Sequence, residues 1–180
     1  GILRDVTGQR RFERAMRVVS TELNTLEGTD CYQRAVIRLA DILEVDIGAI
    51  CCPKREGAQG AVESIALAEA GHIVADISYS VAGNPCERVL GGHSHFIGHG
   101  VRSLHPEHAW LAEKGVEAYA GEPIKDSSGT VVGYLMVLSR QPLTDEPMVA
   151  QVLQLFALAI GAAMTRARNS RQHQALFEFA

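Results

Sequence analysis

The chain has 180 residues, of which 47% are hydrophobic, which suffices for one domain with flanking elements. A formal net charge of −4 and the lack of any basic run longer than a pair argue against a nucleic-acid partner. No segment approaches the roughly 20 apolar residues of a membrane span, and the first residues lack the apolar core of a signal peptide. We therefore expect a cytoplasmic domain without a membrane span.

The four cysteines show no spacing typical of metal ligands: Cys31, Cys51, Cys52 and Cys86. Cys51 and Cys52 are adjacent on a predicted strand, so they should point to opposite faces. Unpaired thiols in a reducing compartment are the simplest interpretation. We expect these cysteines to be structural rather than redox-active.

Two helices are predicted at the start of the chain. Spacings of four and three predict a helix over about residues 9–27, with one apolar stripe made of Phe12, Met16, Val19, Leu23 and Leu26. Such a narrow seam is typical of a helix paired with its mate in a dimer. A second helix is expected to begin at Asp30, with Gln33 completing a capping box. Its expected buried face comprises Tyr32, Val36, Leu39 and Leu43.

Three strands are predicted next. Residues 46–52 are an apolar run that Pro53 ends, and the polar, Gly-rich residues 54–60 indicate a loop. Residues 64–68 and 73–81 are the further strands, although propensity alone also allows helix for the first of them.

The middle of the chain, from Gly83 to about Val116, is expected to be irregular. Asn84 as N-cap and Pro85 at the first helical position predict a short helix that ends at Gly91-Gly92. Another short helix is expected over residues 106–114, with Gly115 as its C-cap.

A hairpin and a long helix complete the predicted elements. Asp126-Ser127-Ser128-Gly129 is a turn sequence between two strand-like flanks, and Pro123 should lie near a strand end or on an edge. Thr144 and Asp145 open the last helix, which carries two adjacent apolar stripes and therefore has two packing partners. The stripes are Met148, Val152, Leu155, Ala159 and Ala162, and Val149, Leu153, Phe156, Ile160 and Ala163.

The hairpin carries a specific pattern: Tyr119-x-Gly-x-Pro-Ile-x-Asp-x-x-Gly-x-x-Val-Gly-x-Leu135. With this pattern and the order of elements, the chain resembles the GAF domain family from about Thr29 to Arg166. Residues 79–90 and 137–143 resemble the corresponding passages of bacterial sensory GAF domains. The resemblance implies an α/β (α+β) fold with a mostly antiparallel central sheet, the terminal helices on one face and a pocket on the other.

The resemblance also implies a domain organisation and a role. Residues 1–28 would be an N-terminal signalling or dimer helix, residues 29–166 the GAF domain, and residues 167–180 a helical linker to an output domain. The expected role is that of a cytoplasmic small-molecule sensor in a bacterial sensor histidine kinase or cyclic-di-GMP enzyme. It would act as a homodimer through its terminal helices, with an unidentified ligand.

Six residues are candidates for the ligand pocket. Aromatic lining is usual in such pockets, and Gly121 would permit close approach, so the candidates are Tyr79, Cys86, Phe96, Trp110, Tyr119 and Gly121. For Tyr79 and Tyr119, plain core packing is an equally good interpretation. Cys86 lies in the first turn of a predicted helix, a position that lowers a thiol pKa. Simple packing of Cys86 is nevertheless favoured, and its surroundings do not resemble bilin-attachment motifs.

Five histidines lie between residues 93 and 108, which raises the question of a metal site. His93 and His95 on an extended segment would share a face, with His99 nearby, but no cysteine or carboxylate stands at a matching interval. We expect no metal site, and the cofactor stays open.

The expected function is regulatory, and catalysis is not expected. One branch of the family reduces free methionine sulfoxide, but the sequences around Cys51, Cys52 and Cys86 do not resemble that branch. No signature of cyclic-nucleotide binding is present either. The remaining alternative is a ligand-free dimerising module, whose pocket would be filled by its own large side chains.

Overall fold

The centre of the fold is an antiparallel sheet. The computed structural model describes residues 2–179, and side chains from residue 6 onward; Gly1 and Ala180, which end the predicted flanking segments, lie outside this range. The described residues form seven strands in the order β3-β2-β1-β7-β6-β5, with β4 also pairing with β2. Their bounds are β1 Ile47–Pro53, β2 Ala61–Glu69, β3 His72–Ile73, β4 Ser78–Ser80, β5 His95–Ile97, β6 Ala118–Lys125 and β7 Val131–Ser139.

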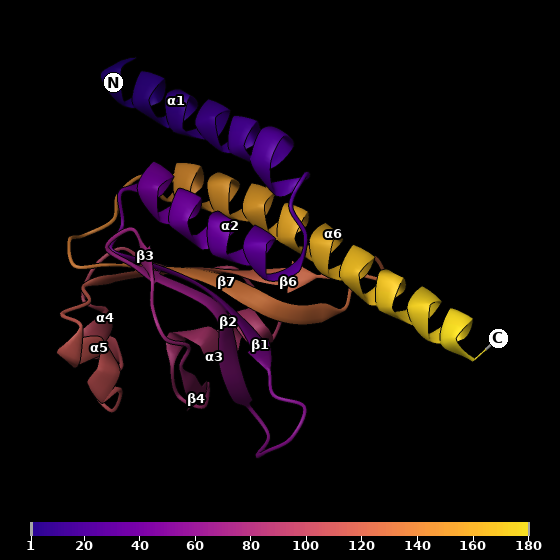
Figure 1. Cartoon of the computed structure of the whole chain (residues 1–180). Helices are drawn as coiled ribbons and strands as arrows, with labels where there is room; N and C mark the ends of the chain where they lie inside the picture. The colour runs from indigo at the N-terminus through magenta and orange to yellow at the C-terminus, as the bar shows by residue number, and fades with distance from the viewer. Residues whose placement is uncertain (1, 180) are drawn as a thin grey trace.

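Helices cover one face of this sheet in two layers. The helices α2 (Gly28–Leu43) and α6 (Glu146–Glu178) lie side by side on the sheet, and α1 (Ile2–Val18) lies outside both of them (Figure 1). A π-helical turn, Val19–Leu23, follows α1. The prediction that the terminal helices share a face is confirmed, but α1 forms an outer layer instead of packing on the strands.

The opposite face carries short elements that frame a cavity. These are α3 (Pro85–Leu90), α4 (Val101–Leu104) and α5 (Ala109–Glu113), all on the side of the sheet away from α2 and α6 (Figure 1). The sheet therefore separates two apolar cores. On β7, Leu135 and Val137 belong to the helix-side core, whereas Tyr134, Met136 and Leu138 belong to the other. This alternation follows from the period of two in a strand.

Several predicted boundaries were wrong. The first helix begins before residue 9, and α2 begins at Gly28 without a side-chain cap, so the capping box at Asp30 does not form. The predicted strand over 73–81 is broken, because β3 ends at Ile73 and β4 begins only at Ser78. The short elements β5 and α4 were not predicted, and the helix expected over 106–114 covers only Ala109–Glu113.

The hairpin and the start of α6 form as predicted. Gly129 has φ of +84°, and Asp126 Oδ1 accepts from Ser128 N and Thr130 N, which closes the turn. Pro123 lies beyond the reach of β5, which pairs only with residues 119–121 of β6. Its missing N–H is therefore tolerated on an effective edge. Asp145 caps α6 by accepting from Met148 N at 3.4 Å.

The apolar stripe of the first helix is used mostly within the chain. Leu23 is buried, and Phe12, Val19 and Leu26 pack against the helix-side core, while Met16 is 44% exposed. Of the described residues in this stripe, Met16 is the one classed as exposed, so most of the stripe is already used inside one chain.

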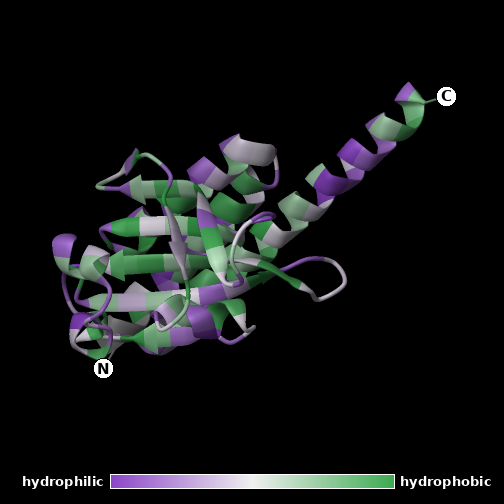
Figure 2. Cartoon of the chain, turned by 90° about the horizontal axis from the view of Figure 1, so that it is seen from below, coloured by the Kyte–Doolittle hydropathy of each residue, from purple (hydrophilic) through white to green (hydrophobic). Residues whose placement is uncertain are grey.

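The helix α6 is 33 residues long and packs closely against the backbone of β6 at one point. A Cβ atom on Gly161 would lie 2.2 Å from the carbonyl oxygen of Lys125 in β6, so only glycine allows this approach. Beyond this crossing, α6 projects from the body (Figure 2). The projecting part is largely hydrophilic along its middle, and hydrophobic residues return near its end, where Leu176 and Phe177 are 71% and 81% exposed. By length and composition α6 would be able to cross a membrane, but half of its most apolar stretch is buried inside the fold. Burial of this kind is also typical of a core helix.

Candidate functional site

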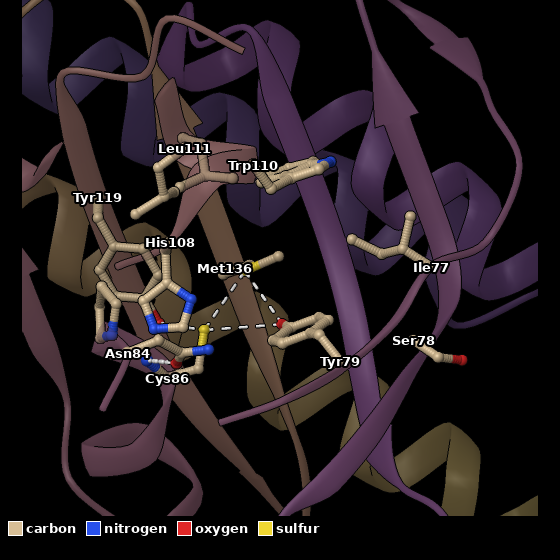
Figure 3. Close-up of a pocket in the computed structure, with 12 residues that line it drawn as sticks. Ile77, Ser78, Tyr79, Asn84, Cys86, His108, Trp110, Leu111, Tyr119 and Met136 are labelled. Atoms are coloured by element: carbon tan, nitrogen blue, oxygen red, sulfur yellow. Dashed lines mark hydrogen bonds between the residues drawn. The ribbon is translucent and has the colours of Figure 1, made fainter. Parts of the chain in front are cut away.

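A cavity of about 310 Å³ lies between the sheet and the short elements on its far side (Figure 3). This volume is at the low end of the roughly 300–1,000 Å³ of small-molecule sites. Strands β6 and β7 form its floor, and β4, α3 and α5 form its walls. Its lining is predominantly apolar and aromatic: Ile77, Ser78, Tyr79, Asn84, Pro85, Cys86, His108, Trp110, Leu111, Tyr119, Met136 and Leu138.

The start of α3 fixes one wall of the cavity. Asn84 Oδ1 accepts from Cys86 N at 2.8 Å, and Asn84 Nδ2 donates to the carbonyl of Ser80 at 3.0 Å. Both polar groups of this amide are thus satisfied by the chain itself. The helix start at Asn84 and Pro85 forms as predicted. The Cys86 side chain in its first turn contacts Tyr119 of β6 and Met136 of β7.

Phenolic hydroxyls and sulfur atoms meet at the base of the cavity. Tyr79 Oη hydrogen-bonds to Tyr134 Oη and lies 3.5 Å from Cys51 Sγ and 3.7 Å from Cys86 Sγ. Tyr119 Oη donates to Cys86 Sγ at 3.4 Å. Because thiols are weak acceptors, Cys86 satisfies the Tyr119 hydroxyl only weakly, whereas the hydroxyls of Tyr79 and Tyr134 bond to each other.

Burial makes this cluster resist ionisation. Loss of solvation raises the pKa of the Cys51 thiol to about 12 and also raises the pKa of Cys86. Burial likewise raises the pKa of Tyr79, Tyr119 and Tyr134. Desolvation of the 4% exposed Cys86 side chain outweighs the lowering of a thiol pKa that a helix start can give. All these groups are neutral at physiological pH and are poor nucleophiles.

One ring nitrogen of the cavity-lining residue His108 lacks a hydrogen-bond partner. His108 Nε2 is shielded from solvent and makes no hydrogen bond within the described residues. Glu107 Oε1 lies 3.8 Å away, which is beyond hydrogen-bond distance. A buried ring nitrogen without a partner costs free energy unless something else supplies one.

Four of the six predicted pocket residues line the cavity, namely Tyr79, Cys86, Trp110 and Tyr119. Phe96 does not line it: β5 turns this side chain toward the helix-side core, opposite to Ile97. Gly121 does not line the cavity either. The space beside its Cα is occupied by other side chains of the chain, not left open to a ligand. A Cβ there would lie 2.4 Å from Tyr119 Oη and 2.8 Å from Val89 Cγ2.

The histidines of the middle segment have different surroundings, and the rings of His105 and His108 are 6.4 Å apart. Within residues 2–179 no three His, Cys, Asp or Glu side chains gather in a way that would hold a metal ion. His95 Nδ1 is 3.0 Å from the carbonyl of Pro85, and His105 Nδ1 is 2.8 Å from that of Gly83. His93 is exposed.

Sequence reasoning missed several lining residues. Met136 and Leu138 share the strand face of Tyr134, and the register of the hairpin places Leu138 opposite Tyr119 and Met136 opposite Gly121. His108 was noted only as part of a histidine-rich segment, and its burial depends on how α5 packs.

A GAF domain model matches residues 27–164. The chain belongs to the GAF domain family. No curated protein sequence matches it, but many solved structures share its fold.

Three of these structures illustrate the likeness. The chromophore-binding domain of the bacteriophytochrome RpBphP3 from R. palustris matches with a TM-score of 0.62 and 15% identity, over 84% of this chain and 59% of that one. The GAF domain of an Acinetobacter phosphoenolpyruvate-protein phosphotransferase gives 0.65 and 14%, over 92% and 97%. JSC1_58120g3 with bound biliverdin gives 0.68 and 12%, over 86% and 99%. At such identities the likeness establishes the fold alone.

The residues of this GAF domain do not fit a bilin. Biliverdin is an open-chain tetrapyrrole with two carboxylates, whereas this cavity has about 310 Å³. Among the described residues, no Arg or Lys lines the cavity to pair with carboxylates. The Cys86 thiol is buried and its pKa is raised, so it is unsuited to covalent attachment.

Proposed function

We propose that this GAF domain is a regulatory ligand-binding domain whose small molecule occupies the cavity under residues 77–111. The observation that carries the proposal is the cavity itself, which is apolar, aromatic and left unfilled by the surrounding side chains. An aromatic-lined cavity with a few convergent polar groups is the usual form of a small-molecule site.

The strands beneath the cavity provide one route from the ligand to the terminal helix. Tyr119 and Met136 face the cavity from β6 and β7, while the other face of the same strands carries α6. Gly161 lies directly on the backbone of Lys125 at the end of β6. A shift of β6 is therefore transmitted to α6 by direct contact, since packed cores deform little.

Ion pairs provide a second route. Lys114 Nζ lies 6.0 Å from the centroid of the cavity-lining Trp110 ring and donates to Glu69 Oε2 at 2.6 Å. Arg140 joins Glu69, Asp46 and the carbonyl of Lys114, and it opens the segment that leads into α6. A movement of α5 on ligand binding would therefore change the contacts of Arg140 at the start of that segment.

The proposal places the chain in a cytoplasmic bacterial signalling protein, as the input domain of a histidine kinase or a cyclic-di-GMP enzyme. Homodimerisation through α1 and α6 belongs to the same proposal. Leu158 and Leu176 are 73% and 71% exposed, and eighteen residues are about five helical turns, so both lie on one face of α6. Such a face suits pairing with a second copy.

A regulatory role is favoured over a catalytic one, because burial raises the pKa of both thiols at the cavity, Cys51 and Cys86. A ligand-free dimerising module is the second candidate, and the exposed leucines of α6 favour it. The unfilled cavity is the observation that favours sensing instead.

Native mass spectrometry of the purified chain, with an absorption spectrum of the same sample, tests the proposal. A bound mass that leaves on denaturation supports sensing, and a dimer supports helix pairing. A bare dimer to which no compound of a small-molecule library binds would favour the dimerising module.

A further inference from the structure

We propose that the base of the cavity binds a soft monovalent metal ion, Cu(I), between the sulfur atoms of Cys86 and Met136, with the Tyr79 hydroxyl at the third corner. This inference goes beyond the proposed function, because the ion would lie against one wall and would not be the small molecule proposed above. It follows from the spacing of three donor atoms, the hydrogen bonds behind them and the charges along the lining.

The three donor atoms form a nearly equilateral triangle. Cys86 Sγ lies 3.7 Å from Met136 Sδ, and Tyr79 Oη lies 3.7 Å from Cys86 Sγ and 3.8 Å from Met136 Sδ. Dashed lines join these atoms in Figure 3. The centre of such a triangle is about 2.2 Å from each corner, close to the roughly 2.3 Å that separates a thiolate sulfur from zinc. An ion of similar size therefore fits there in trigonal coordination with little movement of the donors.

The triangle can be reached through the cavity. All three residues belong to its lining. Tyr79 is half-buried and comes from β4, a strand of only three residues, and its neighbour Ser78 is exposed. An ion that enters the cavity therefore meets these donors without opening either core.

The donor types select a soft ion. Thiolate and thioether sulfur suit Cu(I), whereas magnesium and calcium prefer oxygen ligands. Zinc is usually held by four ligands from histidine, cysteine and carboxylate side chains, and within residues 2–179 no three of these gather. The Met136 thioether is outside that set, and it is the ligand that distinguishes a Cu(I) site here.

Charge balance favours a monovalent ion. Among the described residues, no Arg, Lys, Asp or Glu lines the cavity, and Cys86 is only 4% exposed. On binding, the Cys86 thiol releases its proton to solvent and its sulfur bonds to the metal, as coordinating thiols do. One thiolate and one Cu(I) make a neutral unit, because Met136 and the Tyr79 hydroxyl carry no charge. A divalent ion would leave a buried positive charge, which is costly.

Hydrogen bonds already hold two corners of the triangle from behind. Tyr119 Oη donates to Cys86 Sγ at 3.4 Å, and such a bond strengthens when the acceptor becomes an anion. Tyr79 Oη hydrogen-bonds to Tyr134 Oη. With Tyr79 as the donor, its oxygen keeps a lone pair for the metal. Partners of this kind orient metal ligands and tune their basicity.

Transfer of Cu(I) from a coloured chelator tests the site. The reduced chain is titrated under nitrogen against the Cu(I) complex of bathocuproine disulfonate, and the loss of colour counts the ions bound. We expect tight binding of a single ion, with X-ray absorption at the copper edge showing a sulfur pair at about 2.3 Å. Ag(I), which is also soft and monovalent, should quench Trp110, the one tryptophan of the sequence and part of the cavity lining.

Matched variants in the two cores locate the ion. Cys86→Ser and Met136→Leu should each weaken Cu(I) binding at least about tenfold, because each removes a soft ligand. Cys31→Ser and Met148→Leu change the same residue types in the helix-side core and should leave binding unchanged. Circular dichroism checks that each variant folds. Met136→Leu nearly conserves volume, so it tests the thioether even where Cys86→Ser is unstable.

Three results would overturn the inference. They are the absence of Cu(I) transfer to the chain, full affinity in folded Cys86→Ser and Met136→Leu proteins, and zinc binding as tight as that of Cu(I) through the same residues. None of them affects the proposed function, which the small-molecule library tests separately.

Discussion

The crossing of α6 over β6 at Gly161 is the contact through which a sensed signal would pass, and it makes a quantitative prediction. A Cβ atom at position 161 would lie 2.2 Å from the Lys125 carbonyl oxygen and 3.5 Å from Ile124 Cγ2. Because ordinary contacts begin near 3.4 Å, the Gly161→Ala substitution must move the helix by about 1 Å.

Two opposing effects set the magnitude. Overpacking costs about 1–3 kcal/mol, and the higher helix propensity of alanine returns at most about 1 kcal/mol. We expect the free energy of unfolding to fall by about 1–2 kcal/mol. For a domain of this size, that lowers Tm by about 3–6 °C.

The helix α1 supplies a matched control. A Cβ on Gly8 would come no closer than 3.4 Å, to Asp145 Oδ2. Gly8→Ala should therefore be neutral or stabilising by up to about 1 kcal/mol. Urea and thermal unfolding followed by circular dichroism compare the two variants. A Gly161→Ala protein as stable as the unsubstituted chain would refute the tight crossing.

Three further predictions follow from local contacts. Asp145 caps α6 with φ of +58°, so Asp145→Ala should lower the free energy of unfolding in urea by about 1 kcal/mol or more. Asp145→Gly should lower it less, because glycine adopts a positive φ without strain. Equal losses for the two variants would argue against backbone strain at this position. Burial raises the pKa of Cys51 from 9.0 to about 12, so the folded state holds this proton more tightly. The free energy of unfolding should therefore fall as pH rises from about 9 toward 12, and Cys51→Ala should make this fall less steep. The same pH dependence in the variant would show that Cys51 does not cause the loss. Arg140→Ala removes partly exposed ion pairs to Asp46 and Glu69, so it should lower the free energy of unfolding by about 1 kcal/mol. The loss should be smaller in high salt, because salt screens exposed charges. A loss that does not depend on salt would indicate that the Arg140 side chain acts through packing.

The parts of the fold set by local chemistry were predictable from sequence. The hairpin turn at Asp126–Gly129, the Asn84 cap and the start of α6 each depend on a few adjacent residues, and each forms as predicted. The resemblance to GAF domains placed the terminal helices on one face of the sheet. The match of the GAF domain model to residues 27–164 establishes that the chain belongs to this family.

The parts that depend on distant contacts were not predictable. The three residues of β5 form a strand only because residues 119–121 of β6 lie beside them, and this register turns Phe96 away from the cavity. The Cys86 pKa depends on how deeply the side chain is buried, which the sequence does not reveal. The missing partner of His108 Nε2 likewise arises from the packing of α5.

Hydrogen exchange of the protein with and without a saturating compound from the small-molecule library tests the central claim, that occupancy of the cavity is coupled to α6. The account predicts slower exchange over residues 77–111, together with a change in α6 on both sides of Gly161. Protection confined to the cavity walls, with exchange in α6 unaltered, would contradict the sensing mechanism.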